Sequence, residues 1–128
     1  MHVVTRLWAT LSVAALMTVA CTAQQEQRLT VTASAYNSTR AQTSGNPTEA
    51  AWGDSLEPGM KAIAVSDDLL DRGLEPGTEV RIEGLDGAYT VLDRMASRHR
   101  NRIDIYMGLD VQAAREWGLQ EVTISWSS

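Results

Sequence analysis

The sequence is poor in the residues from which many metal sites and catalytic triads are built. Its 128 residues include one cysteine, two histidines and no phenylalanine. A single cysteine excludes an internal disulfide and a cysteine-rich zinc site, and two histidines leave little material for a histidine-based metal site or triad. Without phenylalanine, the core has to consist of Val, Ile, Leu and Met with a few Trp and Tyr side chains.

Basic residues are scarce relative to acidic ones. Eleven Lys and Arg stand against sixteen Asp and Glu, which gives a formal net charge of −5. Because binding to a phosphate backbone needs a basic surface, no nucleic-acid partner is expected. The 44% of hydrophobic and 21% of charged residues are ordinary values for a globular protein, and the length corresponds to one small domain.

Residues 1–23 have the composition of an export signal. Arg6 is the only charged residue before Glu26, and residues 7–20 form an uninterrupted run of apolar and small residues. This run is shorter than the ~20 residues of a membrane-spanning helix, and small residues follow it. The pattern predicts a signal peptide.

Cys21 ends this run. The stretch from Met17 to Cys21 resembles a bacterial lipobox, in which the cysteine is lipidated and becomes the first residue of the mature protein. The resemblance implies a lipoprotein, anchored in the outer membrane and facing the periplasm. Cleavage after Ala23, which gives a soluble periplasmic protein, is one alternative, and a retained anchor is another. Residues 24–28 are then expected to form a short polar tether.

The rest of the chain has the alternation of a small β-protein. Period-two patterns and short apolar runs predict six strands, at 28–36, 62–65, 79–83, 88–92, 102–106 and 121–126. Two short helices are expected at 67–72 and 111–117, with Ser66 and Asp110 as N-caps and Gly73 and Gly118 at their ends. Residues 37–61 are rich in Asn, Ser, Thr, Gly and Pro and show no period, which is typical of a functional or a mobile loop.

The order strand–strand–helix–strand occurs twice in this prediction. The two halves also share a local pattern, because Gly73-Leu74 precedes the strand Glu79-Val80-Arg81-Ile82 and Gly118-Leu119 precedes Glu121-Val122-Thr123-Ile124. Duplicated units of this size suit a closed barrel, since closure removes the unpaired edges of a small sheet. The sequence therefore predicts a mainly β fold, a six-stranded barrel with two short helices.

Asp104 is the most informative polar residue, because aspartate is disfavoured inside strands. In the strand 102–106 it shares one face with Arg102 and Tyr106, while two isoleucines occupy the other. Two interpretations are open: a structural aspartate held by hydrogen bonds or an arginine, or a carboxyl kept partly protonated for proton transfer. Asp93, at the end of the preceding strand, is the expected second carboxylate if these strands are neighbours.

Several segments together resemble a known family, the three-aspartate (3D) domain. This domain is a double-psi β-barrel and forms the catalytic part of membrane-bound lytic transglycosylase A, and rare lipoprotein A-like barrels have similar segments. The resemblance spans residues 29–126 and depends on the order of short motifs: Ile63-Ala64-Val65, Leu74 to Ile82, Gly84, Tyr89 to Asp93, and Arg102 to Tyr106.

The resemblance implies roles for particular residues. Asp104 matches the aspartate proposed as general acid and base in the transglycosylases, and Asp93 matches the aspartate that precedes it. The third family aspartate follows an Ala-Val pair, where this sequence has Ser66, and the glycines that follow the second are replaced here by residues 94–101. Asp104 and Asp93 are thus the expected catalytic residues, and Ser66 is a candidate substrate contact.

Other candidates for substrate binding come from the aromatic and basic residues. Trp52, in the long loop, is expected either to stack on a sugar ring or to plug the barrel, and Tyr36 and Tyr106 are candidates to line a groove. Trp117 and Trp126 are expected in the core. The basic cluster around Arg102 either is solvated and paired with carboxylates or holds carboxylates of a glycan–peptide polymer. It is also expected to lower the pKa of the two aspartates. Its members are Arg94, Arg98, His99, Arg100 and Arg102.

The resemblance implies an exported cell-envelope protein that acts on the glycan strands of peptidoglycan. As a lytic transglycosylase, it would use Asp104 to protonate the glycosidic oxygen and then to accept the proton of the sugar's own 6-hydroxyl. No water nucleophile is needed, and no metal or other cofactor is implied. The alternatives are a non-catalytic glycan-binding module and an envelope scaffold that binds protein.

Overall fold

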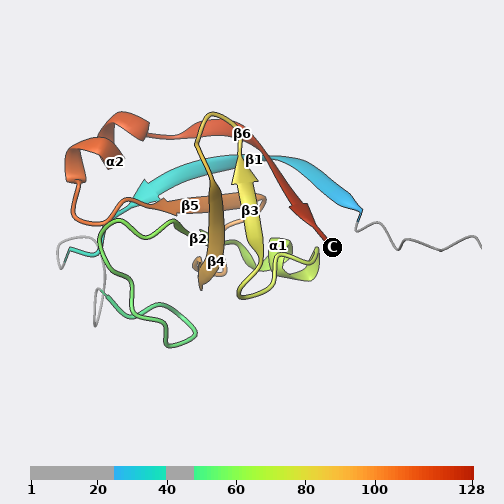
Figure 1. Ribbon diagram of the computed structural model, residues 1–128, viewed down its shortest axis with the longest axis horizontal. Coiled ribbons are helices and arrows are strands. Elements are labelled where there is room, and N and C mark those ends of the chain that lie inside the picture. Colours follow the sequence, from blue (N-terminus) through green and yellow to red (C-terminus); the bar gives the residue numbers. More distant parts are fainter. Residues whose placement is uncertain (1–24, 40–47) are drawn as a thin grey trace, which may run out of the picture.

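The described residues form a closed six-stranded barrel. A computed structural model describes residues 25–39 and 48–128, and the barrel order is β1-β5-β2-β4-β3-β6. The pairs β1/β5 and β2/β4 are parallel and the other four are antiparallel. The predicted fold class is therefore confirmed (Figure 1). The strands are β1 (Glu26–Tyr36), β2 (Ala62–Val65), β3 (Glu79–Ile82), β4 (Ala88–Arg94), β5 (Arg102–Tyr106) and β6 (Gln120–Ser127), and the helices are α1 (Asp67–Asp71) and α2 (Val111–Trp117).

The first strand begins earlier than the sequence indicates. β1 starts at Glu26 and pairs with β6 from that residue, where Glu26 lies opposite Ser127. The prediction of a tether over 24–28 is wrong for its last three residues, because backbone pairing draws polar residues into the sheet. The predicted export signal over 1–23 and the lipidation of Cys21 lie outside the described residues.

Branched aliphatic side chains fill the barrel. They come from alternate positions of the strands, as the period of two requires. Trp126 is also part of this core, with 5% of its surface exposed. Trp117 is only half-buried: it packs against this core, and its indole N–H donates to the Ala33 carbonyl over 3.2 Å. The prediction of a core position therefore holds for Trp126 and only partly for Trp117. The buried set is Val31, Ala33, Ile63, Val65, Leu69, Leu74, Val80, Ile82, Val91, Ile103, Ile105, Val122, Ile124 and Trp126.

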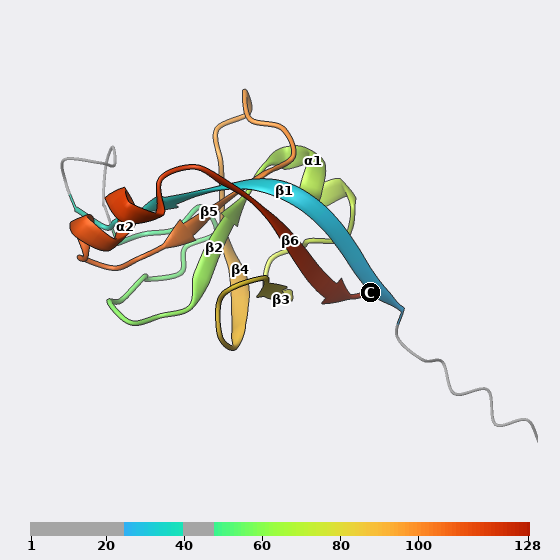
Figure 2. The ribbon, with the colours of Figure 1, turned by 90° about the horizontal axis from the view of Figure 1, so that it is seen from above.

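The two helices lie at opposite ends of the barrel (Figures 1 and 2). At α2 the predicted cap is confirmed, because the Asp110 side chain accepts from the Ala113 N–H over 3.0 Å, and Gly118 ends the helix at a φ of 62°. At α1 the prediction is wrong: Ser66 holds the N-cap position, but its side chain makes no cap hydrogen bond. Its hydroxyl accepts instead from the Arg102 N–H over 3.0 Å, which ties the start of α1 to β5.

Residues 48–61 lie against the outside of the barrel. Ala50 and Leu56 of this segment are buried against Ala62 and Tyr106 of the strands, and an isolated bridge joins Glu49 to Ser55. This part of the long loop is therefore packed, and it forms a small second apolar cluster on the outer face. It runs beside the strands that carry Asp104 and Asp93.

Candidate functional site

Asp104 stands in a row of residues that crosses four neighbouring strands. Ser34 of β1 pairs with Asp104 of β5, Asp104 pairs with Ala64 of β2, and Ala64 pairs with Asp93 of β4. Directly paired residues share one face of a sheet. The two carboxylates therefore lie on the same outer face of the barrel, separated by one small side chain.

This arrangement corrects one sequence-based expectation. The strands of Asp93 and Asp104 are not neighbours, because β2 lies between them. Ala64 is nevertheless opposite both aspartates, so the predicted pair of carboxylates forms across an intervening strand.

A bulge in the β2/β4 pair aims Asp93 at this face. Ile63 pairs with Val91 but Ala64 pairs with Asp93, so Leu92 is an extra residue in the ladder. In a regular strand without this bulge, Asp93, two residues after Val91, would share the face of Val91 and point to the interior. Bulges that redirect a side chain are frequent beside active sites.

Asp104 is a half-buried carboxyl with one side-chain hydrogen bond in the described residues. The Ser34 hydroxyl donates to its Oδ1 over 3.0 Å. Burial raises the pKa of Asp104 above the ordinary aspartate value, and the Asp93 charge adds to this, whereas the Ser34 bond and Arg102 lower it without reversing the direction. The expected lowering of this pKa by the basic cluster is therefore outweighed by burial.

The raised pKa has a consequence for stability. Between the unfolded and the folded pKa of Asp104, the folded state binds more protons, so this group's contribution to the free energy of unfolding falls as pH rises. Asp104→Asn has no proton to lose there. We expect the variant to gain stability relative to the wild type from pH 3.5 to pH 7, measured by urea denaturation. A constant difference over that range would contradict the prediction.

The Asp93 carboxylate accepts hydrogen bonds that hold the backbone in place. Its Oδ1 accepts from the Ala51 N–H over 2.8 Å and from the Arg94 N–H over 2.9 Å. Its Oδ2 accepts from the Tyr36 hydroxyl over 3.5 Å, a long hydrogen bond. The carboxylate thus fastens the outer loop, through Ala51, to the end of β4. Trp52, the next residue in that loop, is 36% exposed.

Removal of the Asp93 carboxylate is expected to release the loop. In Asp93→Ala the Ala51 amide loses its acceptor, and a hydrogen bond to a charged group contributes about 1.5–3 kcal/mol. Hydrogen exchange of the Ala51 amide, followed by NMR, should therefore accelerate by at least ~10-fold. Asp54→Ala, in the same loop, is the matched control and should leave this amide unchanged. Equal exchange in wild type and Asp93→Ala would show that the carboxylate does not hold the loop.

Tyr36 lies between the aspartates and the outer apolar cluster. Its ring packs against Tyr106, with the ring centroids 5.5 Å apart. Burial raises the pKa of the Tyr36 phenol far above its ordinary value, helped by the charges of Asp93 and Asp104. The phenol therefore remains a neutral hydrogen-bond donor. Tyr36 lies beside Asp93, and its predicted contact with a substrate stays a prediction.

The other candidate binding residues divide into buried and accessible ones. Ser66 is fully buried and Tyr106 is 3% exposed, with the Tyr106 hydroxyl 2.9 Å from the Ser38 hydroxyl. Neither can contact a substrate in this conformation, so the prediction of direct contact is wrong for both. Trp52, with 36% of its surface exposed, does not plug the barrel, and its stacking on a sugar ring stays a prediction. Arg102 is half-buried, with its Nη1 3.3 Å from His99 Nδ1.

Of the rest of the basic cluster, Arg94 ends β4, and Arg98, His99 and Arg100 lie on the loop between β4 and β5, which projects from the barrel (Figure 2). Arg94 Nε pairs with Asp67 Oδ1 at 3.1 Å, and Asp68 accepts from the Asn101 N–H over 2.9 Å. The loop is thus held to the first turn of α1, which agrees with pairing to nearby carboxylates. Arg98 and Arg100 are exposed. A partly exposed pair such as Arg94–Asp67 contributes ~0–1 kcal/mol.

No protein-family model matches the sequence, and no curated protein matches it. The family assignment therefore stays a prediction from the short motifs. Within residues 25–39 and 48–128, no group of His, Cys, Asp and Glu side chains has the geometry of a metal site. In the same residues, no helix has the length and hydropathy needed to cross a membrane.

Three parts of the site escape sequence analysis. These are the Ser34 hydroxyl, the Ala51 amide and the bulge at Leu92. A serine in an alternating strand carries no signal of its own, and the Ala51 contact is made by the backbone. Only the strand pairing brings them to the two aspartates.

Proposed function

We propose that this protein is an exported peptidoglycan lytic transglycosylase of the cell envelope, with Asp104 as its acid and base. The observation that carries the proposal is the Asp104 carboxyl on the outer face, half-buried and with a raised pKa. A proton donor works best when its pKa lies near the working pH. The substrate class comes from the motifs shared with the 3D domain.

The reaction needs only one carboxyl. Protonated Asp104 donates to the glycosidic oxygen while the bond from that oxygen to C1 of the muramic acid breaks. The resulting carboxylate then takes the proton of the same sugar's 6-hydroxyl, whose oxygen bonds to C1 and closes an anhydro ring. Asp104 ends protonated, as it began, and no water is consumed.

Neighbouring groups favour such a cycle. Burial keeps the donor form of Asp104 available, while the Ser34 hydroxyl stabilises the carboxylate formed in the first step. Asp93 holds the loop that carries Trp52 next to this face, and an exposed indole can stack on a sugar ring. Asp93 is thus a positioning residue in this proposal.

Digestion of purified sacculi tests the proposal. Soluble anhydromuropeptides, identified by mass spectrometry, are the expected product. New reducing ends would point to a hydrolase, and glycan that is bound but intact would overturn the enzyme assignment.

The second candidate is a non-catalytic glycan-binding barrel. It is favoured by the two positions that depart from a catalytic role: Ser66, which stands where the family has an aspartate, is buried in a backbone contact, and Asp93 is engaged by two amides. Here Asp104 and Trp52 would bind the glycan without cutting it. A wild-type protein that sediments with sacculi and releases no product would support this candidate.

The proposed location rests on Cys21, which ends the apolar run. We expect radiolabelled palmitate to be incorporated into the wild-type protein in a bacterial host and not into Cys21→Ser. A mature N-terminus at Gln24, found by mass spectrometry, would contradict lipidation and indicate a soluble exported protein.

A further inference from the structure

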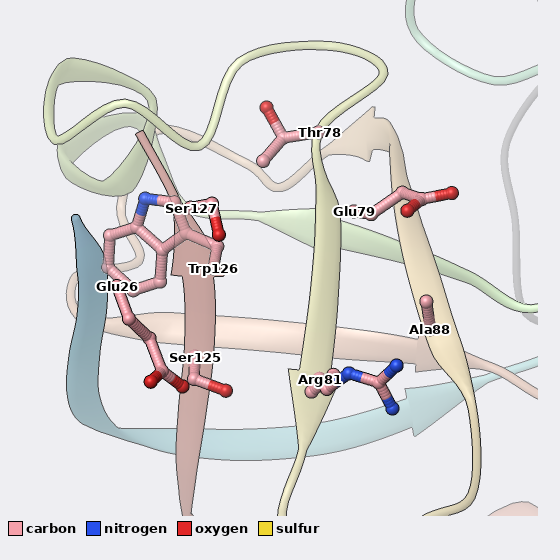
Figure 3. A pocket seen from close by; sticks show the side chains of 8 residues that line it. All are labelled: Glu26, Thr78, Glu79, Arg81, Ala88, Ser125, Trp126 and Ser127. Atoms are coloured by element: carbon pink, nitrogen blue, oxygen red, sulfur yellow. The ribbon is translucent and has the colours of Figure 1, made fainter. Parts of the chain in front are cut away.

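A groove separate from the face that carries Asp104 lies along β3 and β6. It has a volume of about 520 Å³ and is lined by residues of four strands and the turn before β3 (Figure 3). Volumes of roughly 300–1,000 Å³ are typical of small-ligand sites. The lining residues are Glu26, Thr78, Glu79, Arg81, Ala88, Ser125, Trp126 and Ser127. Neither Asp104 nor Asp93 is among them.

The groove opens where two strands of the barrel separate. β3 and β6 pair at Ile82–Ile124 and at Arg81–Ser125, and their pairing stops there. Both strands continue: β3 begins at Glu79, and β6 runs on to Ser127. Glu79 pairs with β4 and Ser127 pairs with β1, so the seam between these two residues is open.

Unpaired backbone groups face each other across this seam. The Glu83 N–H donates to the Thr123 carbonyl over 2.9 Å, so residue 83 directs its backbone groups toward β6 and residue 123 toward β3. Because these directions alternate along a strand, Glu79 and Ser127 also point their N–H and C=O groups into the seam. Among the described residues, no backbone hydrogen bond of either group across the seam is present. Such an edge can pair with an extended peptide.

Charges of both signs surround the seam. Glu26 and Glu79 carry carboxylates and Arg81 carries a guanidinium, and all three residues are exposed. In the described part of the chain, none of the three is within ion-pair distance of an opposite charge. Hydroxyl groups of Thr78, Ser125 and Ser127 also line the groove (Figure 3). Carboxylates match an ammonium group, and a guanidinium matches a carboxylate.

We propose that this groove binds a short, extended zwitterionic peptide. The peptide backbone pairs with the open edges at Glu79 and Ser127, its ammonium group lies at the carboxylate of Glu79, and its carboxylate lies at Arg81, two residues further along β3 (Figure 3). The proposal goes beyond the glycan site. Under the proposed function the peptide would come from the stems of the wall polymer, but binding to the groove does not depend on that source.

An NMR titration of the purified protein with triglycine tests this inference. Triglycine should shift the backbone amide signals of Glu79 and Ser127 in a saturable manner. Triglycine with an acetylated N-terminus and an amidated C-terminus, which has no charge, should bind at least about threefold more weakly. Equal binding of the two peptides, or no saturable shift, would overturn the proposal.

Matched variants locate the binding. Arg81→Gln and Glu79→Gln should each weaken triglycine binding by about threefold or more, and less so in high salt. Arg115→Gln on α2 and Glu83→Gln beyond β3 remove the same charges elsewhere and should have no effect. Unchanged affinity in Arg81→Gln would overturn the assignment. The titration contains no glycan, so its failure leaves the proposed function standing, and a protein inactive on sacculi can still bind triglycine.

Discussion

Asp104→Asn should lose sacculus cleavage by at least ~100-fold while keeping its fold. The amide is nearly the same size as the carboxyl and can still accept from the Ser34 hydroxyl, whose bond to Asp104 is 3.0 Å long. It has no transferable proton, and a positioned proton donor typically contributes 10²–10⁴ in rate. Product release from sacculi, followed by mass spectrometry, measures the loss.

Two controls separate a catalytic role of Asp104 from a structural one. Asp86→Asn removes an exposed carboxylate from the β3/β4 turn and should leave cleavage unchanged. Sacculus binding and the free energy of unfolding of Asp104→Asn at pH 7 should be no lower than in the wild type, because burial disfavours the ionised carboxyl. Cleavage at the wild-type rate by the folded variant would exclude Asp104 as the acid. A loss of ~1–3 kcal/mol in stability would instead indicate an aspartate needed by the fold.

The sequence predicts most of the fold because short strands with one buried face leave a clear period. The strands 62–65 and 102–106 and the helix 111–117 have the expected ends. The errors lie where a contact with a distant part of the chain determines the local structure. β1 starts at Glu26 because β6 pairs with it there, and the Ser66 hydroxyl binds the Arg102 amide of β5 rather than its own helix. Neither partner is visible in the local sequence.

The candidate site is less predictable because it depends on register. Asp93 and Asp104 stand out as aspartates in or beside strands, yet their alignment requires β2 between them and one extra residue, Leu92, in β4. A shift of one residue would reverse the face that Asp93 occupies. The buried positions of Tyr106 and Ser66 likewise follow from packing, by the loop 48–61 and by β5, and not from residue type.

The core that sets this register gives the last prediction, Ile105→Ala. Ile105 is 1% exposed and pairs with Ile63 of β2 and with Ala35 of β1, so it packs inside the barrel next to Asp104. Truncation of a buried isoleucine to alanine removes apolar contacts and leaves a cavity, at a cost of about 2–5 kcal/mol. Small domains have about 5–15 kcal/mol in total.

Urea denaturation at pH 7 should therefore show Ile105→Ala to be less stable than the wild type by about 2–5 kcal/mol. Leu119→Ala is the matched control, since Leu119 is 63% exposed, and substitutions at such positions usually stay within about 0.5 kcal/mol. Because β5 carries both Ile105 and Asp104, looser packing of β5 should also reduce sacculus cleavage by the folded variant, measured at urea concentrations below its denaturation midpoint. If the two variants were equally stable, Ile105 would not lie in the barrel core, and the register that aligns Asp104 with Asp93 would have to be wrong.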